Sequence, residues 1–285
     1  MIIWLASYPK SGNTFLRSLL SSYFFSSDGV FDFKLLKNIK QFPDAGVFNY
    51  LGIDTENESE VIKNYLKVQE EINKRDKNST RLLKTHNSLH EINGHKFTDL
   101  KNSLGVIYIV RDPRNIIRSF SNHNQITLKE TFEKLTEFTT LKGSWEYNGK
   151  LFTTTTHIGT WPSHFLSWKA FKKQNKYILI RYEDLTQHTE ETLLKILSFI
   201  SELKDESFIL NKDKFRNVIK TTTFNNMKEL EKNVNFPEAV KNLKDQKVTF
   251  FKYGPGKKKE INLPIEIKNK VEKIFEKEMI ELGYL

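Results

Sequence analysis

The hydrophobic positions of the chain form two patterns, short continuous runs and longer stretches with helical spacing. Residues 2–7 make the first short run, as a strand buried on both faces of a parallel sheet would. Residues 12–25 follow with apolar side chains at helical spacing. Residues 81–85, 105–110 and 177–181 repeat the short apolar pattern, most clearly at 105–110. The pattern therefore predicts four buried strands separated by helical stretches.

Three further helices are expected from the same spacing. Residues 113–122 should form a helix with Asp112 as its N-cap and Pro113 at its first position. Residues 193–200 carry leucine and isoleucine on one helical face, and residues 263–282 show a similar pattern. These two stretches predict an amphipathic helix after the fourth strand and a long final helix.

Two stretches fit neither pattern well. Residues 54–79 are polar and indicate a solvated helix, and the aromatic and Thr-rich residues 145–161 indicate a long loop that shapes a substrate pocket. Strands that alternate with helical stretches require crossover connections. We therefore expect residues 1–285 to form a single α/β domain with a central, mostly parallel β-sheet flanked by helices.

Composition narrows the classes of function. The 285 residues include 38% hydrophobic and 28% charged residues, as in a globular protein, and the net charge of +10 favours an anionic ligand. The absence of cysteine excludes disulfides, thiolate metal sites and a cysteine nucleophile. No apolar run reaches the roughly 18 residues of a membrane span, and the opening apolar run is too short for a signal peptide. We expect a cytoplasmic protein without a membrane partner.

The segment after the first strand has the chemistry of an anion site. Residues 8–15 (Tyr-Pro-Lys-Ser-Gly-Asn-Thr-Phe) lie between a strand and a helix, where backbone N–H groups and the positive helix end converge. Gly12 allows close approach, Lys10 adds a charge, and Ser11 and Thr14 add hydroxyl donors. The lysine precedes the glycine, so this is not the Walker pattern. An ordinary turn with a helix cap is the alternative.

A second anion site is indicated after the third strand. Arg111 lies at the carboxyl end of this strand, where open α/β sheets bind ligands, and its planar guanidinium suits a phosphate. Ser119 follows near the second turn of the next helix. Alternatively, Asp112 caps the helix and the arginines are solvated or paired with it. Two anion sites on parallel strands of one sheet would hold a nucleotide with phosphates at both ends.

These motifs resemble the sulfotransferases that use 3′-phosphoadenosine 5′-phosphosulfate (PAPS). The first loop is similar to their 5′-phosphosulfate loop, Tyr-Pro-Lys-Ser-Gly-Thr-Thr-Trp, with Asn13 and Phe15 in place of a Thr and the Trp. The second motif resembles their 3′-phosphate strand and helix, matched by Arg111 and Ser119. Bacterial members that sulfate glycopeptide antibiotics have especially similar segments. The resemblance implies a P-loop-like nucleotide-binding topology.

Later segments continue the resemblance along the chain. Residues 84–86 match the family's Lys-Thr-His, whose histidine is the general base, and residues 222–224 resemble its adenine-contacting segment. Residues 251–256 resemble the C-terminal loop that closes over the 3′-phosphate, with Lys252-Tyr253-Gly254 where many members have Arg-Lys-Gly and one more charge. The donor contacts that the resemblance implies are Lys10, Ser11, Gly12, Asn13, Thr14, Phe15, Arg111, Ser119, Tyr182, Thr222, Phe224, Lys252, Tyr253 and Gly254.

The implied reaction moves a sulfuryl group from PAPS to a hydroxyl or amine of a small acceptor and releases adenosine 3′,5′-bisphosphate (PAP). Lys10 would stabilise the charge on the leaving phosphate oxygen, and His86 would take the acceptor's proton. Lys84, two residues before His86 on a strand, would share its face and hold the sulfuryl oxygens or the acceptor. No metal is expected. The aromatic residues within 145–161 favour a planar or amphipathic acceptor, and nothing indicates the oligomeric state.

Other functions remain open on the residues alone. The anion sites would also suit a nucleotide kinase with an atypical loop, which needs Mg²⁺ and ATP. The net charge would suit a nucleic-acid binder, although the basic residues are dispersed and not interleaved with aromatic ones. His86 and His90 have the spacing of metal ligands on a helix, but Asn87-Ser88 favours a turn. Ser119 lacks the Gly-x-Ser-x-Gly setting of an acyl-transfer nucleophile.

Overall fold

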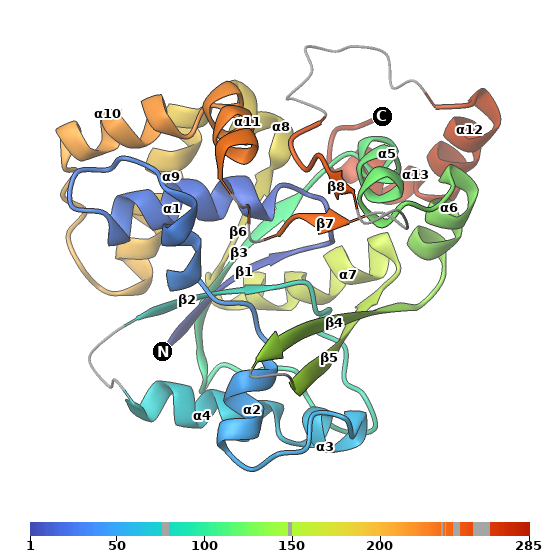
Figure 1. The fold of residues 1–285 in the computed structure, drawn as a ribbon, viewed down its shortest axis with the longest axis horizontal. Helices are drawn as coiled ribbons and strands as arrows, with labels where there is room; N and C mark the ends of the chain where they lie inside the picture. Colours follow the sequence, from blue (N-terminus) through green and yellow to red (C-terminus); the bar gives the residue numbers. More distant parts are fainter. Residues whose placement is uncertain (76–79, 148–149, 235, 237, 242–245, 253–262) are drawn as a thin grey trace.

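Four parallel strands form the central sheet of the computed structural model, in the order β2-β1-β3-β6 (Figure 1). The structure describes residues 1–285 except 76–79, 148–149, 235, 237, 242–245 and 253–262, and it describes only the backbone of 144–147, 150–152 and 241. The four strands are β1 (Ile2–Ser7), β2 (Arg81–Thr85), β3 (Ser103–Val110) and β6 (Tyr177–Arg181). The four predicted strands and the predicted fold class are confirmed.

Helices cover both faces of this sheet because successive strand side chains point to opposite sides. Ile3 and Leu5 of β1 pack into one apolar cluster with α1, α9 and α10, whereas Trp4 and Ala6 pack into another with α7. Figure 1 shows α1 and α9 on one side of the sheet and α7 on the other. These helices are α1 (Asn13–Phe25), α7 (Trp161–Trp168), α9 (Thr189–Leu203) and α10 (Lys212–Thr221).

Shorter helices and a small hairpin surround this core. The 3-10 helices are η1 (Phe33–Asn38) and η2 (Lys169–Gln174), and β7 (Val240–Lys241) pairs antiparallel with β8 (Lys247–Val248). The remaining α-helices are α2 (Ala45–Tyr50), α3 (Glu58–Lys63), α4 (Tyr65–Arg75), α5 (Pro113–Asn124), α6 (Leu128–Thr136), α8 (Tyr182–Gln187), α11 (Phe224–Asn233), α12 (Ile265–Ile274) and α13 (Glu276–Glu281).

The prediction of a long loop at residues 145–161 is wrong. These residues contribute to an antiparallel hairpin of β4 (Thr139–Tyr147) and β5 (Lys150–Gly159), and then to the start of α7. Threonine is β-branched and favours strands, and an Asn-Gly pair between two strands is a strong hairpin signal. The sequence carries both signals, in the threonines 153–156 and in Asn148-Gly149.

Two helix predictions also need correction. Residues 54–79 do not form one solvated helix, because α3 and α4 lie within them and bury Val61, Ile62 and Val68 in the core. The predicted final helix, residues 263–282, is divided into α12 and α13.

The helix after β3 follows its prediction closely. The Asp112 side chain accepts a hydrogen bond from the backbone N–H of Arg114, and Pro113 occupies the first turn of α5. The helix runs two residues beyond its predicted end, to Asn124. Among the described residues, no helix is long and apolar enough to cross a membrane.

Candidate active site

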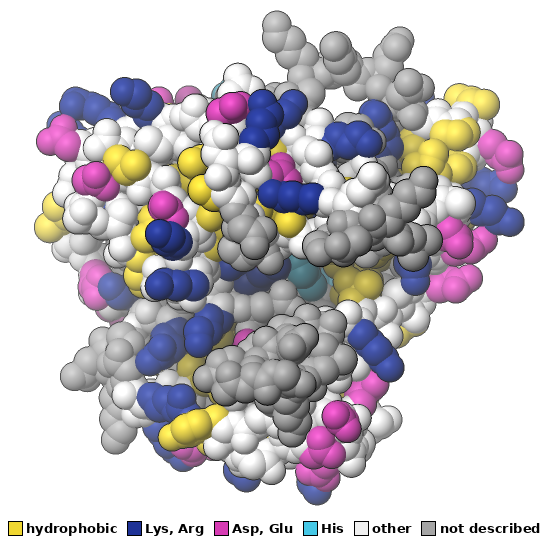
Figure 2. Space-filling model, viewed as in Figure 1, with side chains coloured by type: hydrophobic (Ala, Val, Ile, Leu, Met, Phe, Trp, Pro, Cys, Tyr) yellow, Lys and Arg dark blue, Asp and Glu magenta, His cyan; other side chains and the backbone are white. Residues whose placement is uncertain are grey.

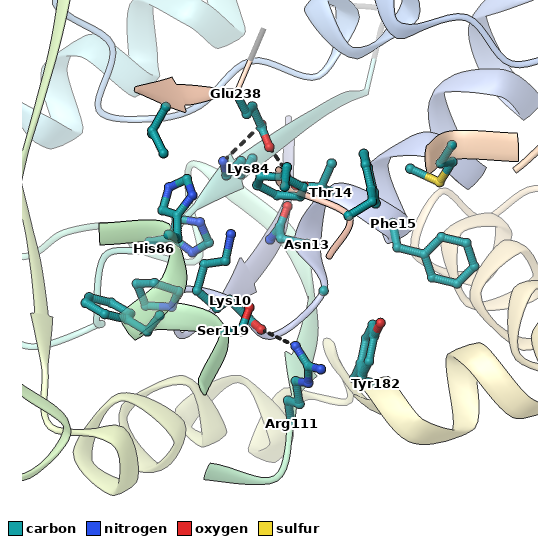
Figure 3. Close-up of a pocket in the computed structure, with 18 of the residues that line it drawn as sticks. Lys10, Asn13, Thr14, Phe15, Lys84, His86, Arg111, Ser119, Tyr182 and Glu238 are labelled. Atoms are coloured by element: carbon teal, nitrogen blue, oxygen red, sulfur yellow. Dashed lines mark hydrogen bonds and ion pairs between the residues drawn. The ribbon is translucent and has the colours of Figure 1, made fainter. Parts of the chain in front are cut away.

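A cavity of about 630 Å³ opens beside the carboxyl ends of the parallel strands. In the space-filling view, a histidine lies in a hollow near the middle of this face, with Lys and Arg side chains around it (Figure 2). Most predicted site residues line the cavity, and Figure 3 shows the side chains that face it. The predicted residues on its wall are Lys10, Gly12, Asn13, Thr14, Phe15, Lys84, His86, Arg111, Ser119, Tyr182, Thr222 and Phe224.

The loop between β1 and α1 has the backbone conformation of an anion cradle. Gly12 is the N-cap of α1 and has φ 100°, and Lys10 also has a left-handed φ, of 67°. A Cβ added to Gly12 would lie 2.2 Å from Cδ2 of Tyr182, so only glycine fits beside this ring. The positive end of α1 therefore meets the cavity at a point where the backbone can closely approach a ligand.

Polar atoms of this loop remain available for a ligand. Ser11 Oγ and Asn13 Oδ1 are buried and have no hydrogen-bond partner among the described residues. Asn13 uses its Nδ2 to donate to the Leu5 carbonyl at 2.9 Å and to Ser7 Oγ at 3.1 Å. Buried polar groups usually have partners, so a bound anion could accept a hydrogen bond from the Ser11 hydroxyl, and a water molecule could donate one to Asn13 Oδ1. The loop residues thus fit a phosphate or sulfate.

Lys10 has an unusual environment for a lysine. Its Nζ lies 3.8 Å from the centroid of the Phe250 ring, on the wall of the cavity. Burial lowers the pKa of Lys10 to about 7, with Glu238 opposing this shift and Lys84 and Arg111 adding to it. An anion bound beside Lys10 would restore its charged form.

Arg111 connects the two predicted anion sites. Its Nη1 donates to the carbonyl of Lys10 at 3.0 Å, and its guanidinium lies 4.3 Å from the centroid of the Tyr182 ring. Arg111 Nε is buried without a hydrogen-bond partner in the described part of the chain. Ser119 of α5 lines the same cavity. The loops after β1 and β3 therefore face one space.

His86 is held in a defined orientation just after β2. Its Nδ1 lies 2.8 Å from the carbonyl oxygen of Ser7 and 3.2 Å from Ser7 Oγ. A carbonyl only accepts, so Nδ1 carries the hydrogen and Nε2 keeps the lone pair. Burial, followed by the charge of Lys84, lowers the pKa of His86 well below its ordinary 6.5. His86 is thus a neutral imidazole with its basic nitrogen fixed by the end of β1.

A second buried imidazole supports the backbone of His86. His164 Nε2 donates to the His86 carbonyl at 3.1 Å, and its Nδ1 accepts from Tyr108 Oη at 2.8 Å. Burial lowers the pKa of His164 to about 3, which keeps this ring neutral. His90, the other half of the metal pair considered from the sequence, instead packs its ring against Phe138, with 5.4 Å between ring centroids.

Lys84 and Arg17 both contact Glu238, and His123 lines the same cavity; sequence reasoning missed Arg17, Glu238 and His123. Lys84 Nζ lies 3.3 Å from Oε1 of Glu238, which also contacts Thr14 (Figure 3). The same carboxylate contacts Arg17. His123 of α5 lines the cavity with its ring perpendicular to Phe250. Arg17 lies one helical turn after Asn13, so its helical spacing from the loop could have identified it. No sequence motif marks Glu238 or His123.

The remaining predicted contacts lie partly elsewhere. Ser11 is buried in the loop and does not form part of the cavity wall. Lys252 Nζ donates to Asn122 Oδ1 at 2.9 Å, at the side of α5. Tyr253 and Gly254 lie outside the described residues.

The sequence and the fold match a known family. The model of the sulfotransferase domain family matches residues 2–283, so the chain belongs to this family. Human Sulfotransferase 2A1 is 28% identical over 125 residues, which cover 44% of this chain and 39% of that relative. The chain thus matches about half or less of the length of several curated relatives.

Two solved structures share the fold. A mouse sulfotransferase, SULT7A1, complexed with PAP has a TM-score of 0.59 at 18% identity, covering 97% of this chain and 84% of that chain. A retinol dehydratase in complex with androsterone and the inactive cofactor PAP has a TM-score of 0.57 at 15% identity, covering 98% and 80%. At these identities the likeness establishes the common fold.

Proposed function

We propose that this protein transfers a sulfuryl group from PAPS to a hydroxyl or amine of a small-molecule acceptor. One observation carries the proposal: the Lys10 loop and Arg111, joined by a 3.0 Å hydrogen bond, line the same cavity as the oriented imidazole of His86. Two anion sites and a base in one cavity are what a doubly phosphorylated donor and an acceptor require. Membership in the sulfotransferase family supports this choice.

The donor would lie across the ends of β1 and β3. The helix end and the loop residues Lys10, Ser11, Gly12, Asn13 and Thr14 would hold its 5′-phosphosulfate. Arg111 and Ser119 would hold the 3′-phosphate, and the family resemblance also assigns Lys252, Tyr253 and Gly254 to this phosphate. The adenine would lie among Phe15, Tyr182, Thr222 and Phe224, three of which offer aromatic surface. The PAP in the SULT7A1 and retinol dehydratase complexes is consistent with such a nucleotide.

The reaction would break the bond between sulfur and the bridging phosphate oxygen. The bond electrons remain on that oxygen, where Lys10 and the N-terminus of α1 stabilise the developing charge. The acceptor oxygen forms the new bond to sulfur, and His86 Nε2 takes its proton. The low pKa of His86 keeps Nε2 unprotonated at neutral pH, so it is ready to accept a proton.

Lys84 would act on the sulfuryl group itself. It is two residues from His86, and both side chains line the cavity. A cation here would bind sulfuryl oxygens as the group passes from donor to acceptor. The charge of Lys84 also lowers the pKa of His86, so the two side chains lie within electrostatic reach.

The acceptor would enter beside the β4–β5 hairpin. Leu141, Lys142 and Gly143 of β4 and Thr156 of β5 line the cavity, together with His123. These side chains mix apolar and polar surface, which suits an amphipathic small molecule with a hydroxyl group. Androsterone in the retinol dehydratase complex is a bound small molecule on the same fold.

The test is binding followed by turnover. Calorimetric titration with PAP should give saturable binding, and PAPS with a panel of phenols, steroids, aliphatic alcohols and amines should give a sulfated product. A nucleotide kinase is the second function that the anion sites alone would allow. Hydrolysis or transfer from Mg²⁺-ATP, with no binding of PAP by the folded protein, would replace the sulfotransferase proposal with the kinase.

A further inference from the structure

A carboxylate lies beside Lys84 in the cavity, where the proposed function places the anionic donor. Glu238 Oε2 accepts a hydrogen bond from Thr14 Oγ1 at 2.6 Å, and Oε1 lies 3.3 Å from Lys84 Nζ (Figure 3). Oε1 also accepts from Arg17 Nη1. Both carboxylate oxygens are therefore bound by side chains of α1 and of β2.

The partners of Glu238 form a subsite built for an oxyanion. Thr14 supplies a hydroxyl, Arg17 a guanidinium and Lys84 an ammonium group, and the Arg17 and Lys84 side chains are only 8% and 11% exposed. Arg17 Nη2 is fixed by the carbonyl of Leu36 at 2.8 Å, which aims Nη1 at the subsite. Three donors converging on one point satisfy a tetrahedral sulfonate or phosphate as well as they satisfy a carboxylate.

Glu238 comes from a distant part of the chain. It lies 224 residues after Thr14 and 154 residues after Lys84. Its side chain is 23% exposed, more than those of its two cationic partners. The carboxylate is thus more exposed than the two cations that bind it.

We propose that Glu238 is a self-ligand that holds the Thr14–Arg17–Lys84 subsite until the anionic 5′ end of the donor displaces it. This inference rests on the proposed function for the identity of the displacing ligand, and it adds Arg17 to the groups that receive the donor. Binding of donor and seating of Glu238 are then mutually exclusive at this subsite. The apparent donor affinity is reduced by the fraction of molecules in which Glu238 is seated.

The electrostatics of the seated state agree with a tight self-ligand. Although burial alone would raise it, the charges of Lys84 and Arg17 hold the pKa of Glu238 below its ordinary value. Glu238 therefore stays ionised at neutral pH, and a competing anion has to displace it.

The experiment compares Glu238→Gln with the wild type by calorimetric titration with PAP and, separately, with inorganic pyrophosphate. Glutamine keeps the shape of Glu238 but removes its charge, so the affinity for PAP and for pyrophosphate should rise about tenfold. This is the rise expected if Glu238 occupies the subsite in about nine-tenths of the free protein. Glu229→Gln is the matched control, because it removes one negative charge from α11 at an exposed pair with Lys232. It should leave both affinities unchanged.

The outcomes separate this inference from the proposed function. Equal or weaker binding of PAP and pyrophosphate by folded Glu238→Gln would overturn the self-ligand and leave Glu238 a structural counter-ion of Arg17. Tighter pyrophosphate binding without any PAP binding would support the self-ligand while the proposed donor failed. If Glu238→Gln does not fold, Glu238→Asp takes its place in the experiment. Aspartate keeps the charge but reaches less far towards Lys84 and Thr14, so it should also tighten the binding of PAP and of pyrophosphate.

Discussion

The Arg111 guanidinium donates a hydrogen bond from Nη1 to the backbone carbonyl of Lys10, 3.0 Å away. It also lies against the Tyr182 ring, with 4.3 Å from Cζ to the ring centroid. One side chain at the end of β3 therefore contacts the loop after β1 and the helix after β6. The two proposed anion sites are joined through this residue.

Arg111→Lys should weaken recognition of the 3′-phosphate selectively. Lysine keeps the charge but loses the planar fork that stacks on Tyr182 and bonds to Lys10. We expect the affinity for PAP to fall about tenfold or more, because a charge-assisted hydrogen bond contributes roughly 1.5–3 kcal/mol. Adenosine 5′-monophosphate, which lacks the 3′-phosphate, should lose much less.

Calorimetry with both nucleotides checks this expectation. Arg216→Lys serves as the control, because Arg216 is exposed and pairs only with its helix neighbour Asp213 among the interactions described. If Arg111→Lys lost equal affinity for PAP and for adenosine 5′-monophosphate, Arg111 would act only by shaping the Lys10 loop.

Local sequence patterns predicted the core of this fold and singled out two loops whose residues line one cavity. The apolar runs of β1 and β3 are long enough to identify strands, and the Asp112-Pro113 pair marks a helix start by its own chemistry. The β4–β5 hairpin was missed because residues 145–161 show only weak hydrophobic periodicity, although their threonines favour strands. The Asn148-Gly149 pair would have identified the hairpin.

Contacts between residues far apart in the sequence could not be predicted from local patterns. Glu238 meets Lys84 only because the chain folds back over the ends of the strands, and no spacing encodes that. The Tyr182 ring fills the space left by Gly12, a relationship that depends on the order of strands in the sheet. The lowered pKa of Lys10 likewise arises from burial that three-dimensional packing creates.

Gly12→Ala should harm the site more than its backbone conformation alone explains. Alanine at a left-handed φ costs roughly 1–2 kcal/mol of stability wherever it occurs. At Gly12 the new Cβ would also lie 2.2 Å from Tyr182 Cδ2, so the ring or the loop must move. We expect Gly12→Ala to lower the free energy of unfolding in urea by more than this backbone cost, and to lower the affinity for PAP markedly.

Gly52→Ala is the matched control for that experiment. Gly52 also has a left-handed φ, of 73°, but a Cβ there meets no atom within 4 Å. Gly52→Ala should lose only the free energy of unfolding that the backbone strain accounts for, and it should bind PAP with normal affinity. If the two variants lose the same stability and both bind PAP normally, the contact between Gly12 and Tyr182 has no role in the site.

His86→Ala should separate chemistry from donor binding. Loss of a general base lowers kcat about 10²- to 10⁴-fold in enzymes generally. The donor contacts proposed above do not include His86, so PAP affinity should be retained. Rates with PAPS and an accepted acceptor, together with PAP titrations, measure both quantities. His95→Asn, at an exposed histidine, should change neither. An active His86→Ala enzyme would remove the imidazole from the mechanism.

PAP affinity should depend on pH through Lys10. Burial lowers the pKa of Lys10 to about 7 in the free protein, so its charged fraction falls as the pH rises above that value. The bound anion favours the charged form, so each pH unit above 7 should weaken binding, by up to about tenfold while bound Lys10 stays protonated. Below pH 7 the charged form dominates and this dependence should flatten. Titrations with PAP at pH 7, 8 and 9 measure the slope.

Lys10→Arg supplies the comparison, because a guanidinium keeps its charge throughout this range. The variant should bind PAP with little dependence on pH between 7 and 9, even if its affinity at pH 7 differs from that of the wild type. The phosphates of PAP are almost fully ionised above pH 7, since their second pKa lies near 6, so the ligand itself adds little slope. A slope that persists in Lys10→Arg would assign the titration to another group and leave Lys10 charged in the free enzyme.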